Sequence, residues 1–172
     1  MKVYNPGLGG IAIEKSSNTT LKRVYVNDPG AYYGALYSCT NVHLQDYQFV
    51  DTSWSNDTVG LLFSNFVTDS TFEDGYMEGI NYGVYFATNQ PSNIRVTDLV
   101  TDGSVVEAIV CNPAPWKMKA EFIDCYLDAS RNTTRIDVTE PGLYVDMINT
   151  TWDGSDGLIV RNEAVLNMSW YL

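Results

Sequence analysis

Positive charge is scarce in this chain. Its 172 residues include 10 lysines and arginines against 21 aspartates and glutamates, and a single histidine, His43. The formal net charge of -11 disfavours a nucleic-acid-binding protein, because phosphate recognition requires clustered basic side chains. Long apolar runs are also missing, so we expect no segment that is inserted in a membrane. The composition therefore predicts an acidic protein that binds neither nucleic acid nor anionic lipid.

Cysteines are few and widely spaced. Cys39, Cys111 and Cys125 form neither a CxxC pair nor a dense framework, which favours buried free thiols and leaves one disulfide as the alternative. The opening residues MKVYNPGLGG lack the apolar stretch of a signal peptide. We expect either a protein that is not exported, or the mature form or an excised segment of one that is.

An internal repeat runs through the chain. Seven runs of alternating apolar residues begin at intervals of 22 to 28 residues and read GIAIEKS, GALYSC, GLLFSN, GVYFAT, EAIVCN, RIDVTE and GLIVRN. Alternation with a period of two predicts β-strands with one buried face. The predicted buried face includes a column made of Ile13, Tyr37, Phe63, Phe86, Val110, Val138 and Val160.

Two further runs follow each of the first six of these runs and end mostly at Asp or Asn. The second runs end at Arg23, Asp46, Asp69, Asp98, Asp124 and Asn149, and the third reach Asp28, Asp51, Asp74, Asp102, Asp128 and Asp153. Asp and Asn suit corners because they tolerate left-handed backbone. One coil cannot bury its apolar face alone, but coils stacked about 4.8 Å apart turn like strands into parallel sheets. We predict an all-β, right-handed single-stranded parallel β-helix of about seven coils with three strands each, formed by residues 9–172 after a lead-in of residues 1–8.

The repeats resemble those of a known superfamily. Runs of the form G-apolar-x-apolar, followed by segments such as NVHLQDYQFVD and NIRVTDLVTDG, resemble the right-handed parallel β-helix of the pectin-lyase-like superfamily. They look most like the repeats of NosD-type proteins and of archaeal and bacterial surface proteins. The resemblance covers the chain from Gly9 onward, and the chain is either a whole β-helix or part of a longer one. It implies the fold but no single activity, since the superfamily includes lyases, hydrolases, epimerases, viral tailspikes and surface modules.

The recurring aspartates invite a calcium-binding or catalytic interpretation. A catalytic carboxylate is needed in one or two coils, whereas these recur in every coil, so turn formation is the stronger explanation. Stacked carboxylates repel one another, and weak Ca²⁺ binding between neighbouring rungs is left open as an alternative. We predict no other cofactor and no dedicated metal site.

Aromatic residues gather in the loops that join consecutive coils. The loops DPGAYYG, DTSWSNDTVG and DGYMEGINYG would place rings beside acids on one edge of the rod, and CNPAPWKMK would flank the opposite edge. Aromatic faces stack on the apolar faces of sugars, while carboxylates accept hydrogen bonds from hydroxyls. The alternative is that the rings only cover the core. The candidates for binding a carbohydrate or protein partner are Tyr32, Tyr33, Trp54, Asp57, Tyr76, Glu78, Tyr82 and Trp116.

The outward positions of the first strands form a mostly apolar stripe. In comparable enzymes this surface borders the substrate groove, but here it lacks the paired carboxylates needed for acid–base cleavage of a glycosidic bond. An exposed apolar stripe usually marks a contact with another subunit or with a further segment of the same protein. We expect self-association through Leu36, Leu62, Tyr85, Ile109 and Ile159.

Five N-x-S/T triplets are candidate N-glycosylation sites, at Asn18, Asn56, Asn132, Asn149 and Asn167. Acceptors of this kind belong to surface loops of secreted proteins. They favour an extracellular location, on a cell or a virion.

Two functions are compatible with these features. The favoured one is a non-catalytic structural or adhesive surface module that self-associates, or binds carbohydrate or protein, through its loops and apolar stripe. The alternative is a polysaccharide lyase, hydrolase or epimerase that uses the carboxylates of Asp57, Asp74, Glu78, Glu107 and Asp137. Such an enzyme requires carboxylates within roughly 5–10 Å of each other in a cleft.

Overall fold

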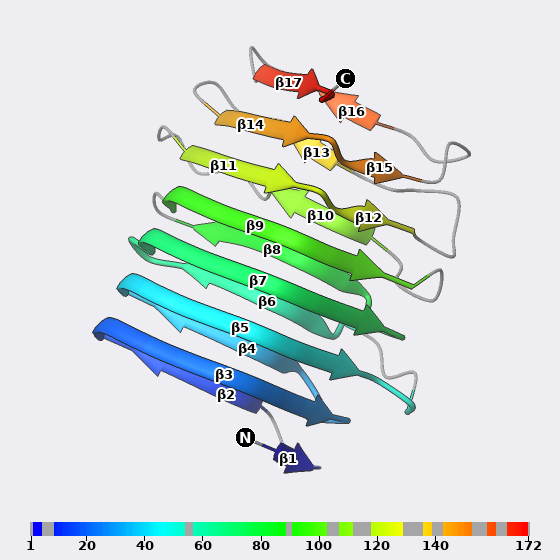
Figure 1. Cartoon of the computed structure of the whole chain (residues 1–172). Coiled ribbons are helices and arrows are strands. Elements are labelled where there is room, and N and C mark those ends of the chain that lie inside the picture. The colour runs from blue at the N-terminus through cyan, green and yellow to red at the C-terminus, as the bar shows by residue number, and fades with distance from the viewer. Residues whose placement is uncertain are drawn as a thin grey trace.

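The chain forms two parallel β-sheets wound into one solenoid (Figure 1). In the computed structural model, the described residues are 2–4, 9–53, 57–88, 91–102, 107–111, 118–128, 136–138, 143–152, 158–160 and 165–171. Helices are absent from these residues, which therefore include no helix that could cross a membrane. The predicted all-β, parallel β-solenoid class is confirmed.

Short and long strands alternate along the chain. The short-strand sheet contains β2 (Gly9–Glu14), β4 (Tyr32–Tyr37), β6 (Val59–Ser64), β8 (Tyr82–Thr88), β10 (Glu107–Cys111), β13 (Ile136–Val138) and β16 (Leu158–Val160). The long-strand sheet contains β1 (Lys2–Tyr4), β3 (Ser17–Asn27), β5 (Thr40–Val50), β7 (Thr68–Glu78), β9 (Ser92–Thr101), β11 (Met118–Ile123), β14 (Leu143–Ile148) and β17 (Val165–Ser169), with β12 (Tyr126–Leu127) and β15 (Thr151–Trp152) beside them. The solenoid has about five turns, slightly fewer than the seven expected.

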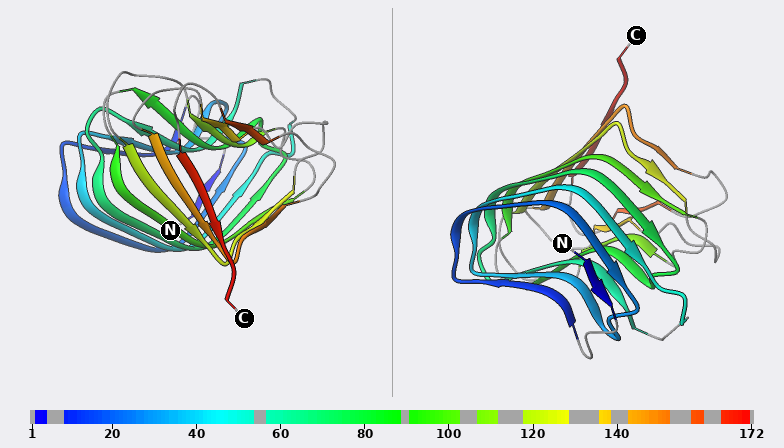
Figure 2. Two further views of the ribbon diagram at one scale, coloured as in Figure 1. Left: turned by 90° about the horizontal axis from the view of Figure 1, so that it is seen from above. Right: turned by 60° about the horizontal axis from the view of Figure 1, so that its bottom comes forward.

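The strands β3, β5, β7 and β9 each bend once, and the next two bends follow directly after β11 and β14, so that a coil has three faces (Figure 2). The bend residues have left-handed backbone, with φ between 49° and 55°, and they superpose as a bend column made of Arg23, Asp46, Asp74, Asp98, Asp124 and Asn149. Asn18, Asn41, Asp69 and Asn93 form a second left-handed column at the start of the long strands. Asp and Asn adopt this conformation at lower cost than other side chains do. The prediction that they act as turn formers is confirmed at these positions.

The third coil departs from the predicted alignment by five residues. The sequence pattern puts Asp69 at the bend, but the bend lies at Asp74, and Asp69 belongs to the column at the start of the strand. Asp69 and Asp74 are both aspartates with left-handed backbone, with φ of 52° and 55°, so the sequence pattern does not distinguish the start of β7 from its bend.

The second coil is shifted by one residue. Repeats aligned on glycine match Gly10 with Gly34, but Gly34 pairs with the residue after Gly10, so Tyr33 lies level with Gly10. Leu36, predicted to face outward, therefore points into the core and is 2% exposed. Tyr37, predicted to point inward, lies on the outer face.

The fifth coil is shifted in the same way. Glu107, aligned with the glycines by its position in the repeat, pairs with Tyr82, so Ala108 lies level with the glycine of β8. Ile109 is therefore a core residue with 0% exposure, and its predicted place on the outward stripe is wrong. Val110 takes the outward position instead, in register with Tyr85.

The remaining members of the predicted inner column are in register. Five members keep their predicted backbone register, namely Ile13, Phe63, Phe86, Val138 and Val160. Leu36 takes the position expected for Tyr37, and Cys111 takes the position expected for Val110. Phe63 stacks on Phe86 with ring centroids 5.0 Å apart and meets Phe72 edge-on at 4.9 Å. Rings that are buried in this way each contribute roughly 1.5–3 kcal/mol through removal from water. From β2 to β8 the core is therefore a continuous ladder of side chains that connects successive coils.

Candidate functional site

The aromatic residues predicted to share one edge of the rod lie in two separate places. Tyr32 and Tyr82 are register partners of Val59 at the start of the short strands. Tyr76 and Glu78 instead lie on the outer face of β7, in the long-strand sheet. The structure therefore does not bring these four candidates together.

The other candidates divide among the core, a turn and the part of the chain that is not described. Tyr33 is fully buried, and its hydroxyl donates a hydrogen bond to the carbonyl oxygen of Val50 at 3.1 Å. Asp57 is exposed in a turn before β6. Trp54 and Trp116 lie outside the described residues. Tyr33 therefore belongs to the interior and not to a surface site.

The apolar stripe on the outer face of the short strands is largely covered. Leu62 is 6% exposed and forms a small cluster with Ala35 and Val59. The partly buried side chains that pack against this cluster are Tyr37, Tyr82, Tyr85 and Ala87. The backbone of Ile159 pairs with that of Asp137, as expected, but the side chain of Ile159 is not among those that the structure describes. With Leu36 and Ile109 in the core, the described residues do not form the exposed apolar stripe predicted for self-association.

Three of the predicted glycosylation asparagines are described, and all three are exposed. Asn18 accepts a hydrogen bond from Asn41 at 2.6 Å. Asn149 donates to Asp124, and Asn167 donates to Asp146 at 2.7 Å. Asn56 and Asn132 lie outside the described residues.

A column of side chains that includes three tyrosines runs along the outer face of the long-strand sheet. We call it the tyrosine column; its members stand two positions after the bend and are Tyr25, Gln48, Tyr76, Val100, Tyr126 and Thr151. Tyrosines occupy every second strand, and a strand spacing of about 4.8 Å puts them about 9.6 Å apart. Tyr126 is 46% exposed and Val100 is 40% exposed, so the column is open to solvent there.

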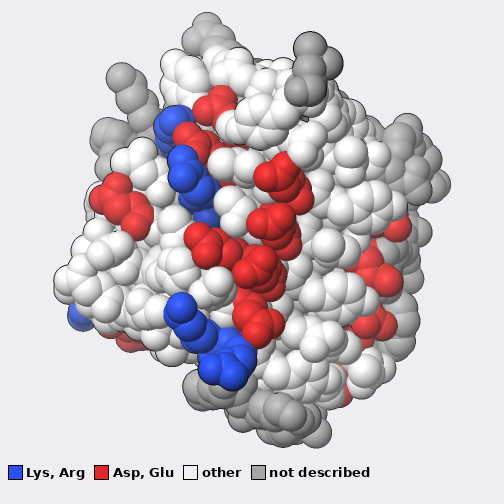
Figure 3. Space-filling model, viewed as in Figure 1, with Lys and Arg blue, Asp and Glu red and all other residues white. Residues whose placement is uncertain are grey.

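Carboxylates border the tyrosine column on both sides. On one side, the bend column presents the exposed side chains of Asp46, Asp74, Asp98 and Asp124. On the other side, the half-buried residues Glu78, Asp102 and Asp128 stand four positions after the bend. Figure 3 shows one acidic band over the middle of the long strands, a second acidic group toward their ends, and uncharged surface between. From Tyr76 to Tyr126 the column is therefore an uncharged strip with two acidic borders, whereas the corresponding positions beside Tyr25 are Arg23 and Asn27.

Tyr76 is held in place by the acidic border beside it. Its hydroxyl donates a hydrogen bond to Oε2 of Glu78 at 3.0 Å. Desolvation raises the pKa of Tyr76 to about 12, with further contributions from the hydrogen bond and charge of Glu78 and from the charge of Asp102. The phenol therefore stays protonated at neutral pH, and the hydrogen bond restricts the orientation of the ring.

Like charges accumulate in the bend column. The pKa of Asp98 is raised, first by desolvation and then by the carboxylates of Asp74, Asp124 and Glu73. Neighbouring members of the column are separated by about one strand spacing, roughly 4.8 Å. A cationic group placed beside Asp98 would therefore relieve a repulsion that the fold itself creates.

The carboxylates of the enzymatic alternative do not converge. Asp74 and Glu78 lie on β7, whereas Glu107 lies on β10 in the other sheet. Asp57 lies in the turn before β6, and the side chain of Asp137 is not described. Within the described ranges, no group of three His, Cys, Asp or Glu side chains is placed to hold a metal ion.

Sequence reasoning found Tyr76 and Glu78 but assigned them to a loop, and it missed Tyr25 and Tyr126. The signal was present in the repeats, because each tyrosine stands two positions after an Arg or Asp at the bend. The predicted alignment of the third coil is wrong by five residues and puts Asp74 at the end of a strand instead of at the bend, so this pattern does not appear in the predicted repeats.

Comparisons with known proteins add no family to this description, since no protein-family model, no curated protein and no solved structure matches the chain.

Proposed function

We propose that this protein is a non-catalytic adhesive surface module that binds an extended carbohydrate along the tyrosine column. The observation that carries the proposal is the in-register repetition of Tyr25, Tyr76 and Tyr126 on alternate strands. A sugar offers an apolar face to an aromatic ring and hydroxyl groups at its edge. The acidic borders supply acceptors for those hydroxyls.

The spacing of the rings favours a chain over a single sugar. Rings about 9.6 Å apart match the length of two sugar residues in an extended β-1,4-linked polysaccharide. A ligand that lies along the solenoid axis would present an equivalent sugar to each tyrosine. Contacts repeated in this way add avidity without any deep pocket.

The fold makes such a surface rigid before the ligand arrives. The inward neighbours of the tyrosine column, such as Val26, Phe49 and Met77, are completely buried. Because the strands that carry the rings are fixed by this core, little conformational entropy is lost on binding. An extracellular or cell-surface location, where polysaccharides occur, agrees with this function.

A matched pair of variants tests the proposal. Tyr126 and Tyr144 are 46% and 44% exposed, but only Tyr126 belongs to the tyrosine column. We expect Tyr126→Ala to weaken binding of a β-1,4-linked oligosaccharide by roughly two- to tenfold, the effect of one stacking contact. Tyr144→Ala should bind like the unmodified protein. Affinity electrophoresis and calorimetry measure both, and equal binding by the two variants would contradict the proposal.

A further inference from the structure

The two acidic borders favour a ligand with positive charge, whereas aromatic stacking alone does not depend on the charge of the ligand. Four carboxylates line one side of the tyrosine column and three line the other, on a chain with a net charge of -11. Arg95 and Lys119 form ion pairs with Glu121 and Asp146, and Asp98 takes part in none of these. The negative net charge would repel an anionic polysaccharide, and a neutral one would gain nothing from it.

Building on the proposed function, we propose that the ligand is a linear β-1,4-linked polymer of amino sugars with free, protonated amines, lying along the solenoid axis. The tyrosine column stacks against the sugar faces, and the acidic borders pair with the amines. Electrostatic complementarity of this kind selects among ligands that stack equally well.

The symmetry of such a polymer matches the surface. Successive sugars of a β-1,4-linked chain are turned over, so their amines project alternately from the two edges of the ribbon. A surface that binds this ribbon by its face therefore needs carboxylates on both sides of the aromatic strip. The structure has Asp74 and Asp98 on one side, and Glu78 and Asp102 on the other. A separation of four strand positions, about 13 Å at roughly 3.3 Å per residue, leaves room for a sugar ring between the borders.

A basic polypeptide is the competing ligand for an acidic surface. Its basic side chains would pair with the carboxylates, but its backbone has no repeated apolar face that would stack on tyrosines of alternate strands. The repeated rings favour the amino-sugar polymer, and the dependence of binding on Tyr126 separates the two ligands.

The test compares oligomers of glucosamine, N-acetylglucosamine and glucose of equal length, together with polylysine, by calorimetry on the full chain in a mildly acidic buffer. We expect the glucosamine oligomer to bind about tenfold more tightly than the two neutral ones, with an affinity that falls as salt is added. Tyr126→Ala should weaken binding of the glucosamine oligomer and leave polylysine binding unchanged.

Charge variants complete the experiment. Asp74→Asn and Asp98→Asn keep a side chain that tolerates the positive φ of the bend, and each should weaken glucosamine binding roughly two- to fivefold. Asp69→Asn is the matched control, because Asp69 is exposed and has a φ of 52° but lies in the other left-handed column. It should leave the affinity unchanged.

The outcomes separate the inference from the proposed function. If neutral oligomers bind as tightly as the glucosamine oligomer, the amino-sugar inference is overturned while carbohydrate binding stands. If Tyr126→Ala leaves glucosamine binding intact, attraction is purely electrostatic and the inference also fails. If none of the oligosaccharides binds, the proposed function falls with it.

Discussion

Tyr47 is the residue at which close packing and hydrogen bonding conflict. Its ring lies over Gly75 of the next strand, where a Cβ atom would be 2.3 Å from both Cζ and Oη of Tyr47. The tyrosine thus occupies space that only glycine leaves open. Its hydroxyl is buried without a hydrogen-bond partner among the described residues. Burial raises the pKa of Tyr47 well above its usual value, with smaller contributions from Cys125 and Asp74.

We predict that Tyr47→Phe stabilises the protein. The substitution removes a buried hydroxyl whose lost hydration is not replaced, so the free energy of unfolding should rise by about 1–2 kcal/mol. Tyr33→Phe is the control, because the Tyr33 hydroxyl donates to Val50 and its removal should cost about 0.5–1.5 kcal/mol. Urea denaturation measures both variants. A loss of stability in Tyr47→Phe as large as that in Tyr33→Phe would show that the Tyr47 hydroxyl is satisfied in solution.

At the scale of the element, the sequence predicts strands and corners well and register less well. The period of two and the recurring Asp and Asn identify the strands and the left-handed turns, because both follow from local backbone chemistry. In the segments GALY and EAIVC, apolar residues occupy both odd and even positions, so the alternation does not show which side chains point into the core. Their register is fixed by neighbouring coils, in which Tyr33 stands level with Gly10.

The candidate site was harder to predict than the fold for a related reason. The tyrosine column exists only because residues from separate coils are in register, and a five-residue error in one coil hides it. Tyr76 was identified as a candidate from its acidic neighbours, which are local in sequence. Tyr126 has no such local signal, and only its pairing with Val100 places it in the column.

The bend column yields a prediction about pH. The folded-state pKa of Asp98 is raised by desolvation and by neighbouring carboxylates, so its ionised form destabilises the folded protein at neutral pH. Asp98→Asn should therefore be more stable than the unmodified protein by about 0.2–0.5 kcal/mol at neutral pH. As pH falls through the raised pKa, Asp98 becomes protonated in the folded state and the advantage of the variant shrinks. It should vanish below the unfolded-state pKa of about 3.9.

Thermal unfolding followed at several pH values measures this effect. Asp69→Asn serves as the control, since the neighbours of Asp69 in its column are Asn41 and Asn93 and not carboxylates. Its stability should stay close to that of the unmodified protein at neutral pH. An Asp98→Asn variant that is less stable at neutral pH would mean that the carboxylate makes a favourable contact outweighing the repulsion.

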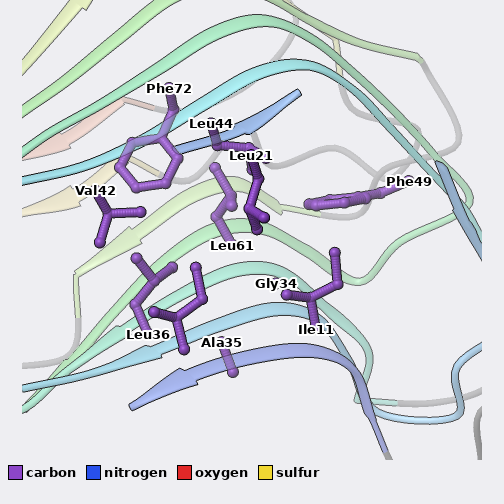
Figure 4. Close-up of a pocket in the computed structure, with 11 residues that line it drawn as sticks. Ile11, Leu21, Gly34, Ala35, Leu36, Val42, Leu44, Phe49, Leu61 and Phe72 are labelled. Carbon is purple, nitrogen blue, oxygen red and sulfur yellow. The ribbon is translucent and has the colours of Figure 1, made fainter. Parts of the chain in front are cut away.

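At the scale of the whole molecule, burial changes along the solenoid axis. Leu21, Leu44 and Phe72 are register partners in successive long strands. Leu21 is partly exposed, whereas Leu44 and Phe72 are buried. These three side chains, together with Ile11 and Leu36, line an apolar cavity (Figure 4), whose volume is about 10 Å³. Since each coil is stabilised mainly by its neighbours, stability should follow this gradient.

Leu44→Ala and Leu21→Ala test the gradient with the same chemical change in one column. Leu44→Ala removes a buried side chain between two coils and should lower the free energy of unfolding by about 2–4 kcal/mol. Leu21→Ala removes a side chain that water already reaches in part, so its cost should be about half as large. Urea denaturation measures both, and hydrogen exchange should show slower exchange in β5 and β7 than in β3. Equal costs for the two variants would mean that Leu21 is as fully buried in solution as Leu44, and would contradict the gradient.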